Sequence, residues 1–169
     1  EGGAVASKNE ELIEKVRSTA NYGRTKEQYV HDRLGLNCRI TDMQSALGLI
    51  QLRKLDKNLA RRKEIADRYR KELPQFQFQK VPSYVTKTTN FMMIALTKYK
   101  RDFWLEKFQR DGIDARKTFN PISRQPCFPH LAVRGLRNSD KIYMDAIALP
   151  IYNAMSDEQV KYVIEIANS

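Results

Sequence analysis

The sequence predicts a mixed α/β chain in which helices cover a small sheet. Three observations support this class: a long stretch with helical spacing of its apolar residues, short segments that alternate or are wholly apolar, and a capped amphipathic segment near the end of the chain. The predicted order is helix, helix, strand, strand, helix, strand, helix, helix. At 169 residues, 41% of them apolar, the chain suits one domain or one and a half and can bury a core.

The first 40 residues are expected to hold a strand-like segment, a short helix and a long loop. The strand-like segment is "AVA" at 4–6, and the helix spans 10–19 with Leu12, Ile13 and Val16 on one face. Residues 21–40 follow no apolar period, so we predict a loop. Loops of this length inside compact folds are usually functional or disordered.

The strongest element is a long helix over 41–73. Thr41 and Gln44 have the spacing of a capping box, and no Gly or Pro interrupts the pattern from Gly48 to Pro74. An uninterrupted helix of this length would measure about 45 Å, so it must cross between layers or domains or pair with another helix. Its stripe at alternating steps of three and four contains one polar member, Arg62. The stripe consists of Leu52, Leu55, Leu59, Arg62, Ala66, Tyr69 and Leu73.

The remainder of the chain alternates between short strands and helices. Three prolines predict an extended loop over 119–131, and Gly112 and Ser156 are the expected caps of two helices. The segment "IALP" follows a helix and is assigned no element of its own. Predicted strands cover 76–81, 90–96 and 113–116, and predicted helices cover 101–112, 139–146 and 157–167.

Composition excludes several classes of protein. No apolar run is long enough to span a membrane, nothing resembles a secretory signal, and two cysteines make no disulfide framework. We therefore expect a reduced, soluble, cytoplasmic protein. The net charge of +10 indicates an anionic partner (nucleic acid, an acidic surface or a phosphorylated small molecule) or else a solvated basic surface. In the basic stretch 53–71 acidic residues are interspersed, which favours a solvated helix face over a nucleic-acid helix.

Few residues have the spacing of a catalytic or metal site. His31 and His130 lie far apart, and no cluster has metal-ligand spacing. Cys38 lacks an evident catalytic partner, so a buried or incidental thiol is expected. Neither a phosphate-binding G-x-x-x-x-G-K-[ST] loop nor a G-x-G-x-x-G fingerprint is present.

The loop before the long helix has the composition of an anion site. Asn37 and Arg39 come directly before the helix N-terminus, where free backbone amides and the helix dipole favour negative charge. An amide, a guanidinium and these backbone groups would converge on a phosphate or a carboxylate. The alternative is that Asn37 is a turn residue and Arg39 a surface cation.

Five segments, in order, resemble the DegT-type nucleotide-sugar aminotransferases. They are "EGGAV", "LGLNCRITDMQSALGLIQLRKLD", "ARRKEIADRYRKEL", "GIDARKTFNPISRQPCF" and "IALPIYNAMSDEQVKYVIEIA". The third corresponds to the family pattern R-R-x-I-A-x-x-Y, and the fourth to G-I-x-T-R-x-x-F-x-P-[LI]-H-x-Q-P-x-[YF]. Cys38 stands where the family usually has an aromatic residue, and Ser123 where a His is common.

The resemblance implies an enzyme of aspartate-aminotransferase fold type I that uses pyridoxal 5'-phosphate. In that family the lysine that forms the Schiff base lies just before the G-E-G-G stretch. The chain is therefore expected to be the C-terminal half of such an enzyme, with no catalytic residue of its own, and to be inactive alone. The resemblance also implies that Asn37 and Arg39 bind the cofactor phosphate of the neighbouring subunit in a homodimer.

The resemblance further implies the domain boundaries and the substrate site. Residues 1–40 would be the tail of the large domain with the dimer-crossing loop, 41–73 the bridging helix, and 74–169 a small C-terminal α/β domain. The implied substrate-binding residues are His31, Arg116, Phe119, Ser123 and Gln125.

The activity implied is transfer of an amino group, with glutamate as the expected donor, to a nucleotide-linked keto-deoxysugar. The product would enter polysaccharide, glycan or antibiotic-sugar synthesis. Two alternatives stay open from the sequence. One is a dehydratase or non-catalytic member of the same fold, in which a His replaces the lysine. The other is a basic nucleic-acid-binding module.

Overall fold

The computed structural model describes residues 2–27, 29–98, 100–129 and 136–169. Glu1 and His130, which the sequence analysis names, lie outside these residues. The chain divides into two compact units, Glu1–Leu55 and Asp56–Ser169, and each is described by itself. In the described part of the chain, no helix combines the length and the apolar character that a membrane span requires.

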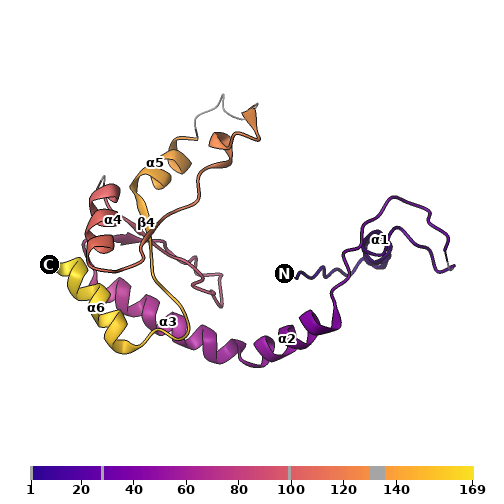
Figure 1. Cartoon of the computed structure of the whole chain (residues 1–169), viewed down its shortest axis with the longest axis horizontal. Coiled ribbons are helices and arrows are strands. Elements are labelled where there is room, and N and C mark those ends of the chain that lie inside the picture. The colour runs from indigo at the N-terminus through magenta and orange to yellow at the C-terminus, as the bar shows by residue number, and fades with distance from the viewer. Residues whose placement is uncertain (1, 28, 99, 130–135) are drawn as a thin grey trace. The chain divides into compact units, whose positions relative to one another are not determined.

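The first unit contains two capped helices joined by a loop (Figure 1). Helix α1 (Glu10–Ala20) begins after Asn9, whose side chain accepts from the Leu12 amide at 3.1 Å. Helix α2 (Asp42–Arg53) begins after Thr41, and the predicted capping box with Gln44 is confirmed. The expectation of a strand at 4–6 was wrong: the segment is exposed coil, because no neighbouring strand supplies hydrogen-bond partners among the described residues.

The predicted helix over 41–73 is interrupted at Lys54, and this part of the prediction was wrong. The Lys54 amide donates to the Gln51 and Leu52 carbonyl oxygens instead of one four residues back, which ends α2. Helix α3 (Leu55–Glu72) follows directly. Neither Gly nor Pro marks the position, so propensity offered no signal for the break.

The second unit is built on a four-stranded antiparallel sheet of order β1-β2-β4-β3. The strands are β1 (Gln77–Phe78), β2 (Met93–Leu96), β3 (Arg116–Lys117) and β4 (Ala146–Leu149). Strand β4 lies between β2 and β3, with Met93 opposite Leu149 and Arg116 opposite Ala148. All four residues of β4 are buried, although the sequence analysis assigned "IALP" to no element.

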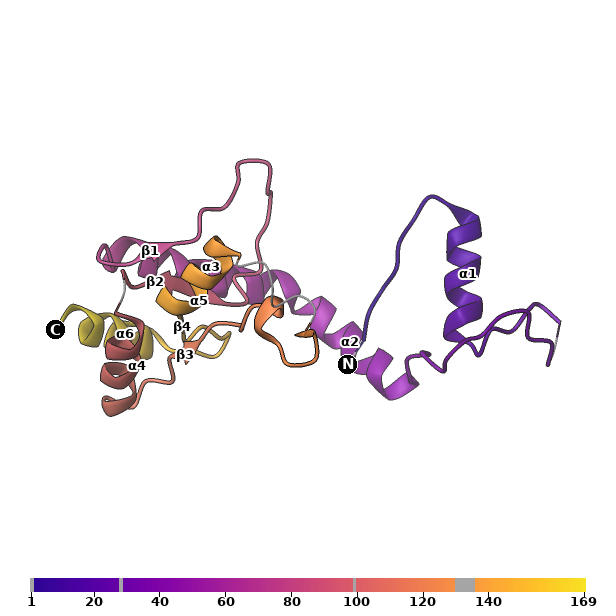
Figure 2. The same ribbon diagram turned by 90° about the horizontal axis from the view of Figure 1, so that it is seen from above.

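The described helices of this unit are α3, α4 (Arg101–Arg110), α5 (Arg137–Asp145) and α6 (Asp157–Asn168). The 3-10 turn η1 (Ile122–Arg124) lies in the loop that was predicted to be extended. Helices α3 and α6 run side by side (Figures 1 and 2). Arg61 ties them together, since its Nη2 donates to the Met155 carbonyl oxygen at 2.6 Å and to Asp157 at 2.8 Å. The predicted caps at Gly112 and Ser156 are confirmed by a left-handed φ of 72° and by a capping box.

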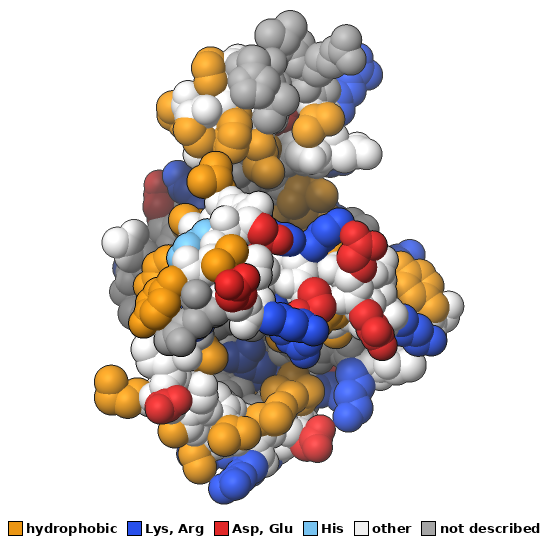
Figure 3. Space-filling model, turned by 90° about the vertical axis from the view of Figure 1, so that its right-hand side faces the viewer, with side chains coloured by type: hydrophobic (Ala, Val, Ile, Leu, Met, Phe, Trp, Pro, Cys, Tyr) orange, Lys and Arg blue, Asp and Glu red, His pale blue; other side chains and the backbone are white. Residues whose placement is uncertain are grey.

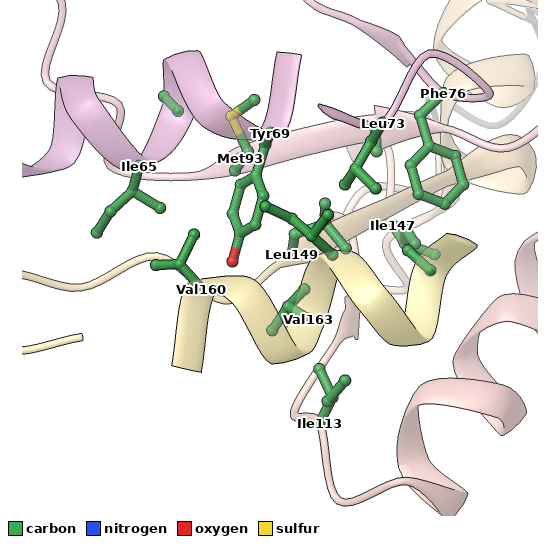
Figure 4. Packing of buried hydrophobic residues seen from close by; sticks show 14 of the residues in the cluster. Ile65, Tyr69, Leu73, Phe76, Met93, Ile113, Ile147, Leu149, Val160 and Val163 are labelled. Atoms are coloured by element: carbon green, nitrogen blue, oxygen red, sulfur yellow. The ribbon is translucent and has the colours of Figure 1, made fainter. Parts of the chain in front are cut away.

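The core of the second unit lies between α3, α6 and the sheet (Figure 4). Helix α3 contributes Ile65 and Tyr69, and Leu73 follows directly after the helix; all three are fully buried. The Tyr69 hydroxyl donates to the Pro150 carbonyl oxygen at 3.0 Å, and burial raises the pKa of this phenol far above its usual value. The remaining labelled members are Phe76, Met93, Ile113, Ile147, Leu149, Val160 and Val163.

The apolar stripe of the predicted long helix is buried only in its second half. Ala66, Tyr69 and Leu73 are fully buried, whereas Leu52 and Leu55 are 65% and 43% exposed. Arg62, the polar member, donates from Nε to the Asn153 side chain at 2.9 Å. Only the second half of the apolar stripe is therefore part of the core of the second unit.

Candidate functional site

The loop between α1 and α2 is folded back on itself by two isolated β-bridges. They pair Asn21 with Asn37 and Arg24 with His31. On one side the Tyr22 amide donates to the Leu36 carbonyl oxygen at 3.0 Å. The loop therefore holds Asn37 at the C-terminal end of α1, although no apolar period indicated regular structure in these residues.

Two glycines make this close pairing possible. Gly23 has a φ of 73°, and a Cβ there would collide with the Arg33 carbonyl oxygen. A Cβ at Gly35 would collide with the Gly23 amide nitrogen and with the Thr19 carbonyl oxygen. Both positions thus require glycine because the two sides of the loop approach each other too closely for a side chain.

Asn37 and Arg39, the predicted phosphate ligands, lie in direct contact. The Nε of Arg39 donates to the Asn37 Oδ1 at 3.0 Å. The Arg39 guanidinium also lies over the Tyr22 ring, 5.5 Å from its centre, and the Arg24 guanidinium lies 5.6 Å from the same ring. Within the described part of the chain, the terminal amino groups of Arg39 form no hydrogen bond, so its fork is held in place and open to an anion.

The helix N-terminus contributes less than the sequence predicted. The capping box uses the Thr41 amide, which donates to Gln44 Oε1 at 3.0 Å, and the Gln44 amide, which donates to Thr41 Oγ1 at 3.3 Å. Asp42 adds a negative charge in the first turn. These two backbone amides are therefore already paired within the chain, which reduces what the helix N-terminus can offer to an anion.

His31, one of the predicted substrate residues, is fixed by the same loop. Its Nδ1 lies 2.9 Å from the Tyr22 carbonyl oxygen, which can only accept, so Nδ1 carries the proton in this contact. The Nε2 of this exposed ring is then an acceptor when the histidine is neutral. Tyr22 thus contacts both Arg39, through its ring, and His31, through its backbone.

The other predicted substrate residues belong to the second unit. Arg116 donates to Asp114 from two nitrogens, and this guanidinium holds the pKa of Asp114 below its usual value. Phe119 is 73% exposed and lines a cavity of about 350 Å³, whereas Arg116 lines a different cavity beside α4. The structure therefore does not bring these two side chains together.

Ser123 and Gln125 lie in and directly after the turn η1. The Gln125 side chain donates to the Asn120 carbonyl oxygen at 3.4 Å. Arg124, between them, donates from Nε to Asp140 of α5 at 2.7 Å and lies 5.8 Å from the centre of the Tyr143 ring. This pairing fixes the turn against α5.

Sequence reasoning missed Tyr22 and Arg24. Tyr22 has a positive φ of 61°, which is unusual for an aromatic residue and indicates a constrained position. An aromatic residue directly before Gly23 and two positions before Arg24 was the available signal. Cys38, expected to be buried or incidental, is exposed, and the same holds for Cys127.

The chain is similar to several nucleotide-sugar enzymes of bacteria. It is 32% identical over 173 residues to a UDP-4-amino-4,6-dideoxy-N-acetyl-beta-L-altrosamine transaminase of Campylobacter jejuni, covering 96% of this chain. It is 26% identical over 172 residues to a GDP-perosamine synthase of Caulobacter vibrioides, covering 97% of this chain. In both cases the match spans 46% of the relative, so the chain corresponds to about half of their length.

Solved structures agree with these similarities. A DegT DnrJ EryC1 StrS aminotransferase from Brucella abortus superposes with a TM-score of 0.87 at 24% identity, covering 95% of this chain and 43% of that one. Helicobacter pylori PseC, an aminotransferase involved in the biosynthesis of pseudoaminic acid, gives a TM-score of 0.83 at 25% identity, covering 95% and 46%. The sequence model of one family matches residues 1–168. The chain belongs to the DegT/DnrJ/EryC1/StrS aminotransferase family.

Proposed function

We propose that this chain is part of a pyridoxal-phosphate-dependent aminotransferase. The enzyme would transfer an amino group from glutamate to a nucleotide-linked keto-deoxysugar, for polysaccharide, glycan or antibiotic-sugar synthesis. The family match over residues 1–168 carries this proposal, and the relatives named as sugar transaminases support it. Because the chain spans about half the length of those relatives, the activity is assigned to the longer protein, in which the Schiff-base lysine would lie upstream.

The residues of the first unit fit the phosphate of the cofactor. Arg39 offers two terminal amino groups with no other partner among the described residues, and Asn37 and the Tyr22 ring hold the guanidinium in place. A planar guanidinium of this kind matches the oxygens of a phosphate. When bound, pyridoxal phosphate supplies the electron sink for amino transfer.

The remaining roles concern binding and orientation. His31, Arg116, Phe119, Ser123 and Gln125 are proposed to contact the nucleotide sugar. The neutral Nε2 of His31 and the Arg116 guanidinium would meet hydroxyl and phosphate groups, and Phe119 would present an exposed apolar ring. Arg39 would fix the cofactor through charge without taking part in proton transfer.

We further propose that the enzyme is a cytoplasmic homodimer in which Asn37 and Arg39 serve the active site of the neighbouring subunit. The loop that carries them is exposed and internally rigid, which suits a segment that reaches another chain. Its apolar side chains Leu34, Leu36 and Ile40 are 98%, 69% and 54% exposed. Figure 3 shows apolar side chains beside charged ones on one face of the molecule.

A labelling experiment tests the proposed function. The full-length protein is incubated with nitrogen-labelled glutamate, pyridoxal phosphate and a nucleotide-linked keto-deoxysugar. We expect the label in the sugar product and 2-oxoglutarate in equal amount. Loss of a sugar hydroxyl without incorporation of label would instead identify a dehydratase and would overturn the proposal. The control reaction omits glutamate.

A further inference from the structure

A pocket in the second unit is lined by only one of the residues assigned to the proposed function, Phe119. It lies between α3 and the loop of residues 79–92 and consists of two adjoining cavities of about 350 and 430 Å³. Both cavities are lined by Arg70, Val81, Val85, Thr88 and Asn90. We call them together the Arg70–Asn90 pocket.

Asn90 is the unusual residue of this pocket. It is 7% exposed and has a φ of 39°. Its Oδ1 accepts from Arg70 Nη2 at 3.2 Å. An arginine can only donate, so this contact fixes which side of the amide faces Arg70. The Nδ2 is therefore a buried donor, and it has no acceptor among the described residues. Because buried donors are almost always paired, this amide indicates a missing acceptor.

The charges around the pocket favour an anion. Four cationic side chains (Lys63, Arg70, Lys80 and Lys87) and two carboxylates (Asp56 and Asp67) line the two cavities. Both carboxylates are already paired, Asp67 with Arg70 and Lys63, and Asp56 with Lys87. Lys80 forms no ion pair in the described part of the chain. The four cations and two carboxylates leave an excess of two positive charges, so the pocket favours an anionic ligand.

The N–H donors and the apolar walls of the pocket indicate the chemical class of the ligand. Arg70 and the Asn90 amide present N–H groups from two planar side chains, which match the two oxygens of a carboxylate. Apolar and aromatic residues form much of the wall: Phe78, Val81, Pro82, Val85, Phe91, Met93 and Phe119. Inside the loop, the Val85 amide donates to the Pro82 carbonyl oxygen at 3.0 Å, and no strand ladder restrains residues 79–92, so a small shift can admit a ligand to Nδ2.

We propose that the Arg70–Asn90 pocket binds the carboxylate of a small organic acid with an apolar or planar body. The acid group contacts the Arg70 guanidinium and the Asn90 amide, and the body packs against the aromatic wall. The acid group would be held by Arg70 and Asn90, and neither residue is assigned to the cofactor or to the nucleotide sugar; Phe119 alone belongs both to the wall of this pocket and to the proposed substrate site.

Benzoate is the probe, and calorimetric titration of the full-length protein is the assay. Benzamide has the same shape without the charge and is the ligand control. Asn90→Asp keeps the shape of the side chain but replaces the donor by a second anion, and Arg70→Gln removes the charge. Arg68→Gln is the matched control, since Arg68 belongs to the same helix, pairs with Glu72 and lines neither cavity.

We expect benzoate to bind the wild-type protein and the Arg68→Gln variant equally. Asn90→Asp and Arg70→Gln should each weaken binding at least about tenfold, and benzamide should bind the wild type at least about tenfold more weakly. Thermal unfolding verifies that the variants are folded. If only one of Asn90→Asp and Arg70→Gln is folded, that variant alone is enough for the test. Absence of benzoate binding to the wild type, or equal binding by the variants, overturns the proposal. Equal binding would place the acid elsewhere, including the donor site of an aminotransferase.

Discussion

Replacing Arg39 by alanine removes the guanidinium that is proposed to bind the cofactor phosphate. Arg39 is held by a 3.0 Å hydrogen bond to Asn37 and by the Tyr22 ring. A charge-assisted hydrogen bond contributes about 1.5–3 kcal/mol, which corresponds to about 10- to 150-fold in affinity. Because the side chain is exposed in this chain, we expect the lower part of this range, about 10- to 30-fold.

The assay is the dissociation constant of pyridoxal phosphate for the full-length protein, measured by equilibrium dialysis. Asn37→Ala keeps the charge of Arg39 but removes the hydrogen bond that holds its Nε. We therefore expect the affinity for the cofactor to fall about fivefold. Arg33→Ala is the control, since Arg33 lies in the same loop but pairs with Asp32. Equal losses for Arg39→Ala and Arg33→Ala would refute a direct phosphate contact and would indicate only a general effect of charge.

Three further predictions concern packing and the loop, and each uses the full-length protein. Tyr69→Phe should lower the free energy of unfolding by about 1 kcal/mol in urea titration, because Pro150 loses its hydrogen-bond donor; no change would mean that water replaces it. Ile65→Ala should cost about 2–4 kcal/mol and more than Leu55→Ala, and equal costs would show that Leu55 is buried in the complete protein. Gly35→Ala should weaken cofactor binding as much as Arg39→Ala, because a Cβ at Gly35 would collide with the other side of the loop. An unchanged dissociation constant of the cofactor would show that the conformation of the loop does not matter for the cofactor site.

Helix ends that are marked by capping residues were predictable from the sequence. Thr41 with Gln44 and Ser156 each marked a helix start, and Gly112 marked a helix end, because caps depend on local hydrogen bonds and backbone angles. The break at Lys54 carries no such signal. Strand β4 was missed because its central position in the sheet follows from pairing with β2 and β3, which lie far away along the chain.

The candidate site was predictable in part. Asn37 and Arg39 were identified from their place before a helix, and the structure places them in contact; that they bind a phosphate stays a prediction. The role of Tyr22 depends on two bridges, between residues 16 and 7 positions apart, which a periodic pattern does not reveal. The Arg70–Asn90 pocket was missed for a similar reason, since it joins a helix to a loop that is distant in sequence.

Mixed dimers test the central claim most directly, that this is an aminotransferase whose Asn37 and Arg39 act on the neighbouring subunit. One full-length subunit lacks the Schiff-base lysine, and the other carries Arg39→Ala. Amino transfer is measured at a cofactor concentration that saturates the wild type but not the Arg39→Ala homodimer. The site that keeps its lysine receives an intact loop from its partner, so activity should recover on mixing. If mixed dimers form and amino transfer stays at the level of the separate variants, the claim is contradicted.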